Sequence, residues 1–305
     1  YIHLIPHRNE MELEKFEGIV SALLTPSTAY REKMAELIEF HLKHGVNGFF
    51  VLGTTGEGVK LGPSARQEVA EAAVEYAGSR GLVIIHVGAS DMDTVKQLTR
   101  HASRIGAHAV SAVAPFYYRY DPDSLTSFYQ SIADISSVPV LVYNNPGRQG
   151  YSIPLEGLQK ILETVKPTVG LKESSGDPDT LLQVFKRFKG SRFLGAGGDH
   201  LMVYSFIIGY RVHVSSLSSI YPEIAKQVFD CVKNGKLDEA LRLQTTLNKV
   251  RAALKKIGPD MASNRYALKL RGIDIGGPIP PTRDLTPEEK KTLENLLPKE
   301  QELRA

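Results

Sequence analysis

The sequence has little that would tie it to an extracellular, membrane or nucleic-acid setting. It contains one cysteine, Cys231, so no disulfide can form within the chain, and a cytoplasmic protein is the expectation. No stretch reaches the length of a transmembrane span, and residues 1–12 lack the apolar core of a signal peptide. The formal net charge is only +3, with no dense basic run. We therefore expect neither a membrane nor a nucleic-acid partner.

What remains is an ordinary globular composition. The 305 residues are 42% hydrophobic and 23% charged, long enough for one large α/β domain or two small ones. Cys231 falls in a helical segment, where we expect a small core residue rather than a nucleophile. The first methionine is Met11, which leaves open whether residues 1–10 belong to the native chain.

From residue 16 onward, short apolar segments alternate with amphipathic helical segments. Near-continuous apolar strands that alternate with helices predict a parallel sheet buried on both faces. Eight such units favour a closed (β/α)8 barrel, the TIM barrel, over an open sheet. The turn at residues 25–27 also lacks the glycine fingerprint of an open dinucleotide-binding fold. The expected strands are residues 18–24, 48–52, 82–87, 107–114, 138–143, 168–172, 192–196 and 211–215.

After residue 235 the pattern is helical. We expect helices over residues 237–256 and 263–271, and a third that ends near residue 297. Thr286 is the expected N-cap of the third helix, with Pro287 at its first position. The predicted organisation is an N-terminal extension (1–15), a barrel domain that holds the site (16–235) and a C-terminal helical region (236–305).

Lys172 is the central candidate, because it ends the sixth expected strand. Barrels of this kind carry their sites at the C-terminal ends of the strands. In a dry interior, desolvation disfavours the charged ammonium, and a neutral amine can attack a ketone to form a Schiff base. By itself the signal is weak, since a lysine near a strand end commonly forms a salt bridge or extends to solvent. Strand alternation directs Glu173 away from the interior.

Other strand ends supply further candidate site residues, and each of them also has an ordinary structural interpretation. Tyr143 ends the fifth strand, where a phenol can relay protons, although a core tyrosine is an equal reading. Thr54 and Thr55 lie between glycines, as a carboxylate-binding turn requires, or they cap the next helix. Arg148 follows in a Pro-Gly turn and could bind a second carboxylate, or it lies exposed on the surface.

Three other functions use the same architecture. A metal-dependent lyase needs two or three His, Asp or Glu ligands; His86, Glu57, Asp199 and His200 are available, but no His-x-His pair occurs. A phosphate- or flavin-binding barrel is suggested by the glycines at 197–198 but not by the glycine-free segment after the last strand. A non-catalytic protein that binds a keto acid also stays open.

Three motifs together carry a family likeness. Residues 53–57 (Gly-Thr-Thr-Gly-Glu), 143–146 (Tyr-Asn-x-Pro) and 170–173 (Gly-Leu-Lys-Glu) resemble, in order and spacing, the dihydrodipicolinate synthase/N-acetylneuraminate lyase family of pyruvate-dependent class I aldolases. The likeness extends over residues 16–300. It implies a (β/α)8 barrel with a C-terminal helical region, no metal or organic cofactor, and a homotetramer built as a dimer of dimers.

The resemblance also implies roles for individual residues. Lys172 matches the Schiff-base lysine, and Tyr143 matches the tyrosine that shuttles protons. Thr54 and Thr55 match the pair that binds the pyruvyl carboxylate, with Thr54 also linking Tyr143 to a further tyrosine. Tyr117 matches that further tyrosine, which reaches across the dimer interface into the neighbouring site.

The substrate is predicted less sharply, because subfamily signals conflict. Val214 matches the apolar residue beside the pyruvate methyl group, and Gly198 is a further candidate for substrate binding. Arg148 resembles the synthases, which use an arginine there for the carboxylate of the aldehyde. Residues 115–120 instead look like the sugar-acid aldolases and sialic acid lyases, and residues 263–266 replace the Asn-Pro-x-Pro segment of the synthases. We expect reversible cleavage of a 2-keto-3-deoxy acid to pyruvate and a small aldehyde; the alternative is condensation of pyruvate with aspartate semialdehyde.

Overall fold

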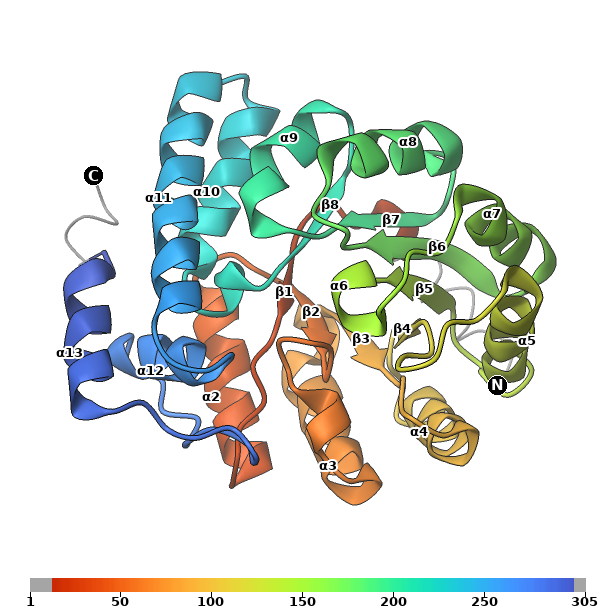
Figure 1. The fold of residues 1–305 in the computed structure, drawn as a ribbon, viewed down its shortest axis with the longest axis horizontal. Coiled ribbons are helices and arrows are strands. Elements are labelled where there is room, and N and C mark those ends of the chain that lie inside the picture. The colour runs from red at the N-terminus through yellow and green to blue at the C-terminus, as the bar shows by residue number, and fades with distance from the viewer. Residues whose placement is uncertain (1–12, 299–305) are drawn as a thin grey trace.

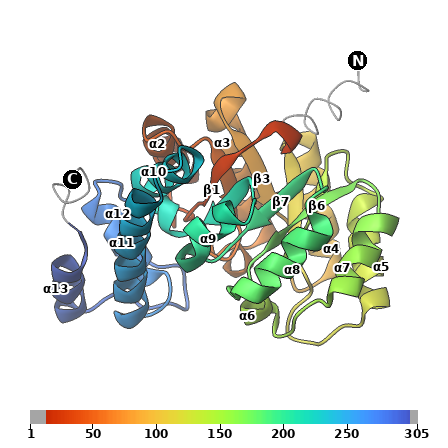
Figure 2. The same cartoon turned by 90° about the horizontal axis from the view of Figure 1, so that it is seen from above.

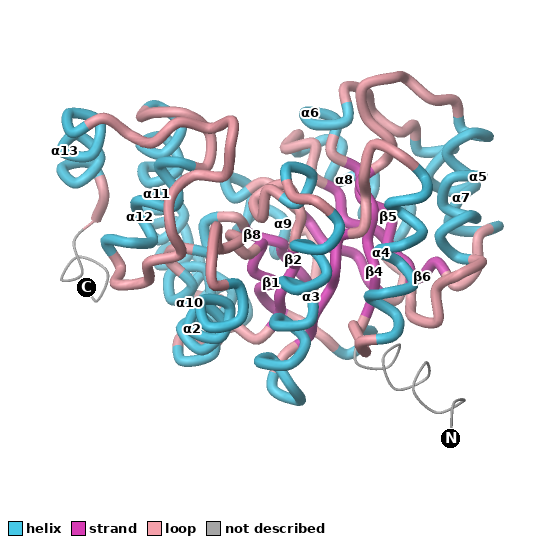
Figure 3. The backbone as a smooth tube through the Cα atoms, turned by 90° about the horizontal axis from the view of Figure 1, so that it is seen from below, coloured by secondary structure: helices cyan, strands magenta, loops and turns pink. Residues whose placement is uncertain are grey.

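A closed parallel barrel forms the centre of the molecule in the computed structural model, which describes residues 13–298. Within them, eight strands follow one another around the barrel in chain order, and β1 pairs with β8 to close it. The predicted TIM barrel is confirmed. Figure 3 shows the strands at the centre with the helices around them. The strands are β1 (Gly18–Ala22), β2 (Gly48–Val51), β3 (Leu82–His86), β4 (Ala109–Val113), β5 (Val140–Asn144), β6 (Thr168–Glu173), β7 (Phe193–Ala196) and β8 (Val212–Ser215).

Helices after each strand cover the outside of the barrel (Figure 1). Their starts follow the expected chemistry: Asp91 accepts a hydrogen bond from the Thr94 amide at 2.8 Å, and proline stands in the first turn of several others. The covering helices are α2 (Tyr30–Lys43), α3 (Pro63–Ala77), α4 (Met92–Arg104), α5 (Pro122–Ala133), α7 (Leu155–Thr164), α8 (Pro178–Phe188), α9 (Met202–Ile207) and α10 (Pro222–Lys233). A single turn, α6 (Pro146–Gln149), follows β5.

Several strands are shorter than the apolar segments that predicted them. The amide of Leu24 binds the Ser219 hydroxyl at 3.0 Å instead of extending the ladder, so β1 ends earlier. The amide of Ala107 binds Ala102 and closes α4, which delays β4. Pro139 has no amide hydrogen, and β5 begins only after it. The apolar segments therefore predicted where the strands lie but not the residues at which they begin and end.

A β-bulge in β6 sets the direction of the candidate lysine. Val140 pairs with Thr168 and the next residue, Leu141, pairs with Gly170, so Val169 is the extra residue. Gly170 is required there, because a Cβ atom would lie 1.7 Å from the carbonyl oxygen of Phe193. Val169 packs in the barrel interior, and after the bulge Lys172 faces the interior while Glu173 faces outward.

The C-terminal helices α11 (Leu237–Lys256), α12 (Ala262–Leu270) and α13 (Pro287–Leu296) lie on the side of the barrel opposite α5 and α7 (Figures 1 and 2). Thr286 caps α13 in a capping box with Glu289, as expected. A buried ion pair between Arg265 of α12 and Glu57 ties these helices to the loop after β2. The division at residues 15 and 235 stays a prediction. No helix within residues 13–298 is long and apolar enough to cross a membrane.

Candidate active site

A cavity of about 230 Å³ opens where the carboxyl ends of the strands meet, and we call it the barrel-mouth cavity. Side chains from β5, β6 and β8, from the loop after β2 and from the C-terminal helices line it. It brings together every site residue predicted from the sequence except Tyr117: Thr54, Thr55, Tyr143, Arg148, Lys172, Gly198 and Val214.

Lys172 is held in this cavity by aromatic faces rather than by an acid. The side chain is buried, and its Nζ lies 4.0 Å from the ring centroids of both Phe50 and Tyr143. No carboxylate within residues 13–298 forms an ion pair with it. Gly195 pairs with Lys172 on β7, and a Cβ atom there would come within 3.1 Å of Val214. The position that pairs with Lys172 is therefore too crowded for a side chain, and the amine has no salt bridge among residues 13–298.

Tyr143 is placed beside Lys172 by strand register and is embedded in a polar network. Its hydroxyl oxygen accepts a hydrogen bond from Asn145 Nδ2 at 2.8 Å and lies 3.2 Å from Thr54 Oγ1. Burial alone would raise the pKa of this phenol. The positive charge of Lys172 and the hydrogen bonds from Thr54 and Asn145 outweigh burial, so the pKa of Tyr143 lies below its ordinary value. A phenol in this state can both release and take up a proton.

The Thr54–Thr55 turn is shaped by close packing. A Cβ atom at Gly58 would lie 2.0 Å from the carbonyl oxygen of Leu52, so only glycine permits this loop. The alternative in which the threonines cap the next helix does not hold, because α3 has Gly62 at its N-cap position and no side-chain cap. Both threonines instead line the barrel-mouth cavity beside Lys172.

Arg148 lines the same cavity, but its charge is already compensated. Its NH2 group lies 2.6 Å from Asp260 Oδ2, and both side chains are more than half exposed. Tyr117 lies apart from this network: it is 88% exposed, has a positive φ of 78°, and packs its ring against Tyr118. Its expected link to Thr54 therefore stays a prediction that involves a neighbouring subunit.

The residues that suggested a metal site have other partners. Glu57 binds Arg265, and His86 Nε2 accepts the amide hydrogen of Val113 at 3.1 Å. Asp199 accepts hydrogen bonds from the β8 loop, including the Ser215 hydroxyl at 2.5 Å. In the described part of the chain, no three His, Cys, Asp or Glu side chains are grouped so that they could hold a metal ion.

Several residues that line the barrel-mouth cavity were not predicted from the sequence. Asn145 stood at the unspecified position of the Tyr-Asn-x-Pro motif, although it lies only two residues beyond Tyr143, just after the end of β5. The other missed residues come from β1, from loops and from helices distant in sequence, for which no motif gave a signal: Ala22, Ser174, Ser216, Leu217, Arg251, Leu254, Lys255, Asp260, Met261 and Asn264.

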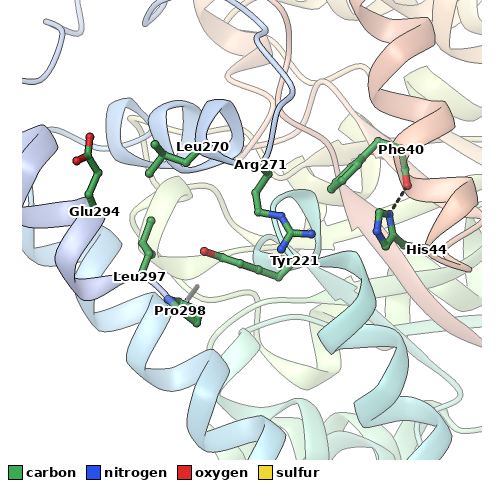
Figure 4. Close-up of a pocket in the computed structure, with 8 residues that line it drawn as sticks. All are labelled: Phe40, His44, Tyr221, Leu270, Arg271, Glu294, Leu297 and Pro298. Carbon is green, nitrogen blue, oxygen red and sulfur yellow. Dashed lines mark hydrogen bonds between the residues drawn. The ribbon is translucent and has the colours of Figure 1, made fainter. Parts of the chain in front are cut away.

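A larger cavity of about 450 Å³ lies away from the barrel mouth, between α2, α10, α12 and α13 (Figure 4). Its cation, Arg271, lies 2.7 Å from Glu223 and over the rings of Phe40 and Tyr221. The arginine charge is thus already paired, and among residues 13–298 no lysine or cysteine lines this cavity. We therefore assign the chemistry to the barrel mouth.

The fold and the site define a TIM-barrel protein with a buried lysine beside a tyrosine of lowered pKa. The chain belongs to the dihydrodipicolinate synthetase family, whose model matches residues 15–300. An uncharacterized DapA-like lyase from Halobacterium salinarum is 34% identical to it over 91% of each chain. N-acetylneuraminate lyase from Rhizobium meliloti is 29% identical, over 87% of this chain and 88% of its own.

A solved structure agrees with this assignment. Dihydrodipicolinate synthase from Bacillus anthracis is similar with a TM-score of 0.87 at 25% identity, over 93% of this chain and 99% of its own. The family expected from the three motifs is confirmed, and it is an enzyme family of lyases and aldolases.

Proposed function

We propose that this protein is a Schiff-base-forming, pyruvate-dependent aldolase that reversibly cleaves a 2-keto-3-deoxy acid to pyruvate and an aldehyde. The observation that carries the proposal is the amine of Lys172, which lies in the barrel-mouth cavity, 4.0 Å from the ring of Tyr143 and with no acidic partner among residues 13–298. Pairing of a nucleophilic amine with a proton-transferring group is what imine formation requires. The cytoplasmic location and the homotetramer expected from the sequence stay predictions.

In the proposed reaction, the Thr54–Thr55 turn binds the carboxylate of the substrate, with its C3 side toward Val214. Lys172 first gives a proton to the Tyr143 phenolate. The neutral amine then attacks the C2 ketone, and Tyr143 returns the proton while the C2 oxygen leaves as water. The product is a protonated imine. The protonated imine itself serves as the electron sink. These steps therefore need no metal or organic cofactor.

Cleavage then follows from the imine. Tyr143 takes the proton of the C4 hydroxyl group, the C3–C4 bond breaks, and its electron pair moves through C2 to the imine nitrogen. An aldehyde leaves, and an enamine of pyruvate remains on Lys172. Protonation at C3 and hydrolysis by water release pyruvate and restore the amine. In reverse, the enamine adds to an aldehyde.

Condensation with aspartate semialdehyde is the alternative that Arg148 supports, since an arginine at the mouth can bind the carboxylate of the aldehyde. The ion pair of Arg148 with Asp260 compensates that charge, which is why we prefer cleavage of a 2-keto-3-deoxy acid.

Borohydride reduction in the presence of pyruvate tests the proposal directly. We expect a reduced pyruvyl adduct on the peptide that contains Lys172, identified by mass mapping, and no adduct in a folded Lys172→Ala variant. Absence of the adduct in the wild type, or activity retained by Lys172→Ala, would falsify the mechanism. Pyruvate release from 2-keto-3-deoxygluconate and N-acetylneuraminate, compared with condensation with aspartate semialdehyde, then separates the two functions.

A further inference from the structure

Two cations on α11 face the barrel-mouth cavity. Arg251 and Lys255 are four residues apart, which places them on the same side of the helix, and both line the cavity. Arg251 is half-buried and Lys255 is exposed at the rim. Their positive charges also act on His200, which follows β7. Burial is the largest cause of the lowered pKa of His200, and the charges of Arg251 and Lys255 lower it further.

Neither cation is compensated within residues 13–298. No hydrogen bond or ion pair joins Arg251 or Lys255 to another residue there. Two other cations of this half of the chain, Lys226 and Arg271, are paired. Lys226 binds Asp230 at 2.5 Å, and Arg271 lies 2.7 Å from Glu223. Like charges four residues apart on a helix repel each other. Their arrangement therefore opposes helix stability unless an anion lies between them.

The acids of the cavity are not available to these cations. Asp199 is held by the hydroxyl of Ser215 and by the amides of Ser216 and Leu217. Asp260 is paired with Arg148. What remains near α11 is neutral and polar, chiefly Asn264 and the Ser216 hydroxyl. The part of the cavity next to α11 thus carries an excess of positive charge.

The helix dipole explains only part of this pattern. Basic residues in the last turn of a helix interact favourably with its C-terminal end, which accounts for Lys255 and Lys256. Arg251 lies one turn earlier and is half-buried, so the dipole does not account for it.

We propose that the substrate carries a second anionic group, a carboxylate or a phosphate, at the end remote from the reacting ketone, and that Arg251 and Lys255 bind it. This inference rests on the proposed aldolase function and specifies its substrate class. The planar guanidinium of Arg251 offers two parallel donors to such a group, and the ammonium of Lys255 adds a point charge. A substrate that ends in a neutral hydroxyl group, such as 2-keto-3-deoxygluconate, has the reacting end that the aldolase requires but leaves both charges uncompensated.

Condensation of pyruvate with three aldehydes tests the inference. Glyceraldehyde 3-phosphate ends in a phosphate, succinic semialdehyde in a carboxylate, and glyceraldehyde in a hydroxyl group. We expect kcat/KM for one of the anionic aldehydes to fall by about tenfold or more in the Arg251→Gln/Lys255→Gln double variant, with glyceraldehyde changed by less than about twofold. The more affected aldehyde identifies the anion. Lys249→Gln, an exposed residue of α11 outside the cavity lining, is the matched control and should behave as the wild type.

The outcomes separate this inference from the aldolase proposal. If the double variant handles all three aldehydes as the wild type does, the anion site is overturned, while the borohydride adduct on Lys172 still supports the aldolase. If no adduct forms, calorimetric titration with glycerol 3-phosphate decides. Binding that is lost only in the double variant supports the anion site, and equal binding by all variants overturns it.

Discussion

At the scale of single residues, the site depends on how Lys172 and Tyr143 meet. The barrel order puts β5 beside β6, and the register pairs Tyr143 with Lys172 directly. A sequence that predicts the barrel therefore predicts that these side chains are neighbours. It does not predict the hydrogen bond from Asn145 to Tyr143 or the ion pair of Arg148 with Asp260, because these depend on local loop geometry and on a partner 112 residues away.

The bond from Asn145 leads to a prediction about pH dependence. It stabilises the phenolate, so Asn145→Ala should raise the pKa of Tyr143. A smaller fraction of phenolate is then present at a given pH, and the rise of kcat/KM with pH should move to higher pH. Asn145→Asp should move it further, since a carboxylate opposes the phenolate. pH–rate profiles and ultraviolet titration of tyrosinate, each compared with Tyr143→Phe, measure the shift.

A control variant far from the site keeps this test specific. Gln159→Ala changes a partly exposed side chain of α7 that binds Glu163, and it should leave the pH profile unchanged. If Asn145→Ala also leaves the profile unchanged, the bond to Tyr143 has no part in the proton transfer.

At the scale of elements, periodicity predicted the barrel and the C-terminal helices, but side-chain direction needed more. Strict alternation along β6 would put Val169 and Lys172 on opposite faces. The bulge at Val169 brings both to the interior, and it depends on how closely Gly170 approaches β7, which no local pattern reveals. In the same way, α11 reads as an amphipathic helix that covers the barrel. Only the packed structure shows that Arg251 and Lys255 lie at the cavity.

The buried pair of Glu57 and Arg265 should hold α12 on the barrel. Arg265 Nε and NH2 lie 3.0 and 2.6 Å from Glu57 Oε2, and NH2 also donates to the carbonyl of Thr25 at 2.7 Å. Removing Arg265 leaves the buried Glu57 carboxylate with Lys60 alone, whose Nζ lies 2.8 Å from Glu57 Oε1, so we expect Arg265→Gln to reduce the free energy of unfolding by at most about 3–5 kcal/mol. The Glu57→Gln/Arg265→Gln double variant should lose less than the sum of the single losses. Denaturant unfolding measures each value.

An exposed pair provides the comparison for this effect. Arg80 lies 2.9 Å from Glu39 with both side chains about half exposed, and Arg80→Gln should cost less than about 1 kcal/mol. Equal losses for Arg265→Gln and Arg80→Gln would mean that burial of the Glu57 pair does not contribute to the stability of the fold.

At the scale of the whole molecule, one expected site residue is missing from the cavity. Tyr117 is 88% exposed, and Tyr118 and Val59 are exposed by 67% and 56%. Large apolar side chains in such positions mark interaction surfaces when they lie together. The resemblance to pyruvate-dependent aldolases implies that Tyr117 completes the site of a neighbouring subunit. That contact joins two subunits, and the structure of one chain holds only one side of it. The sequence therefore predicts a feature of the assembly rather than of the single chain.

Mixing two impaired variants tests whether Tyr117 acts across an interface. We expect Tyr117→Phe to fold normally and to lower activity, and Lys172→Ala to be inactive. If each site takes Lys172 from one subunit and Tyr117 from its partner, a hybrid dimer has one complete site. Statistical exchange in an equal mixture should then restore about one site in four.

Replacing Lys172→Ala in the mixture by the Lys172→Ala/Tyr117→Phe double variant should abolish the gain, since no intact Tyr117 remains. Light scattering should give about four times the chain mass of 33.6 kDa for the wild type. A mixture no more active than its Tyr117→Phe component, despite demonstrated subunit exchange, would place Tyr117 outside the neighbouring site, because the relay would then not depend on a second chain.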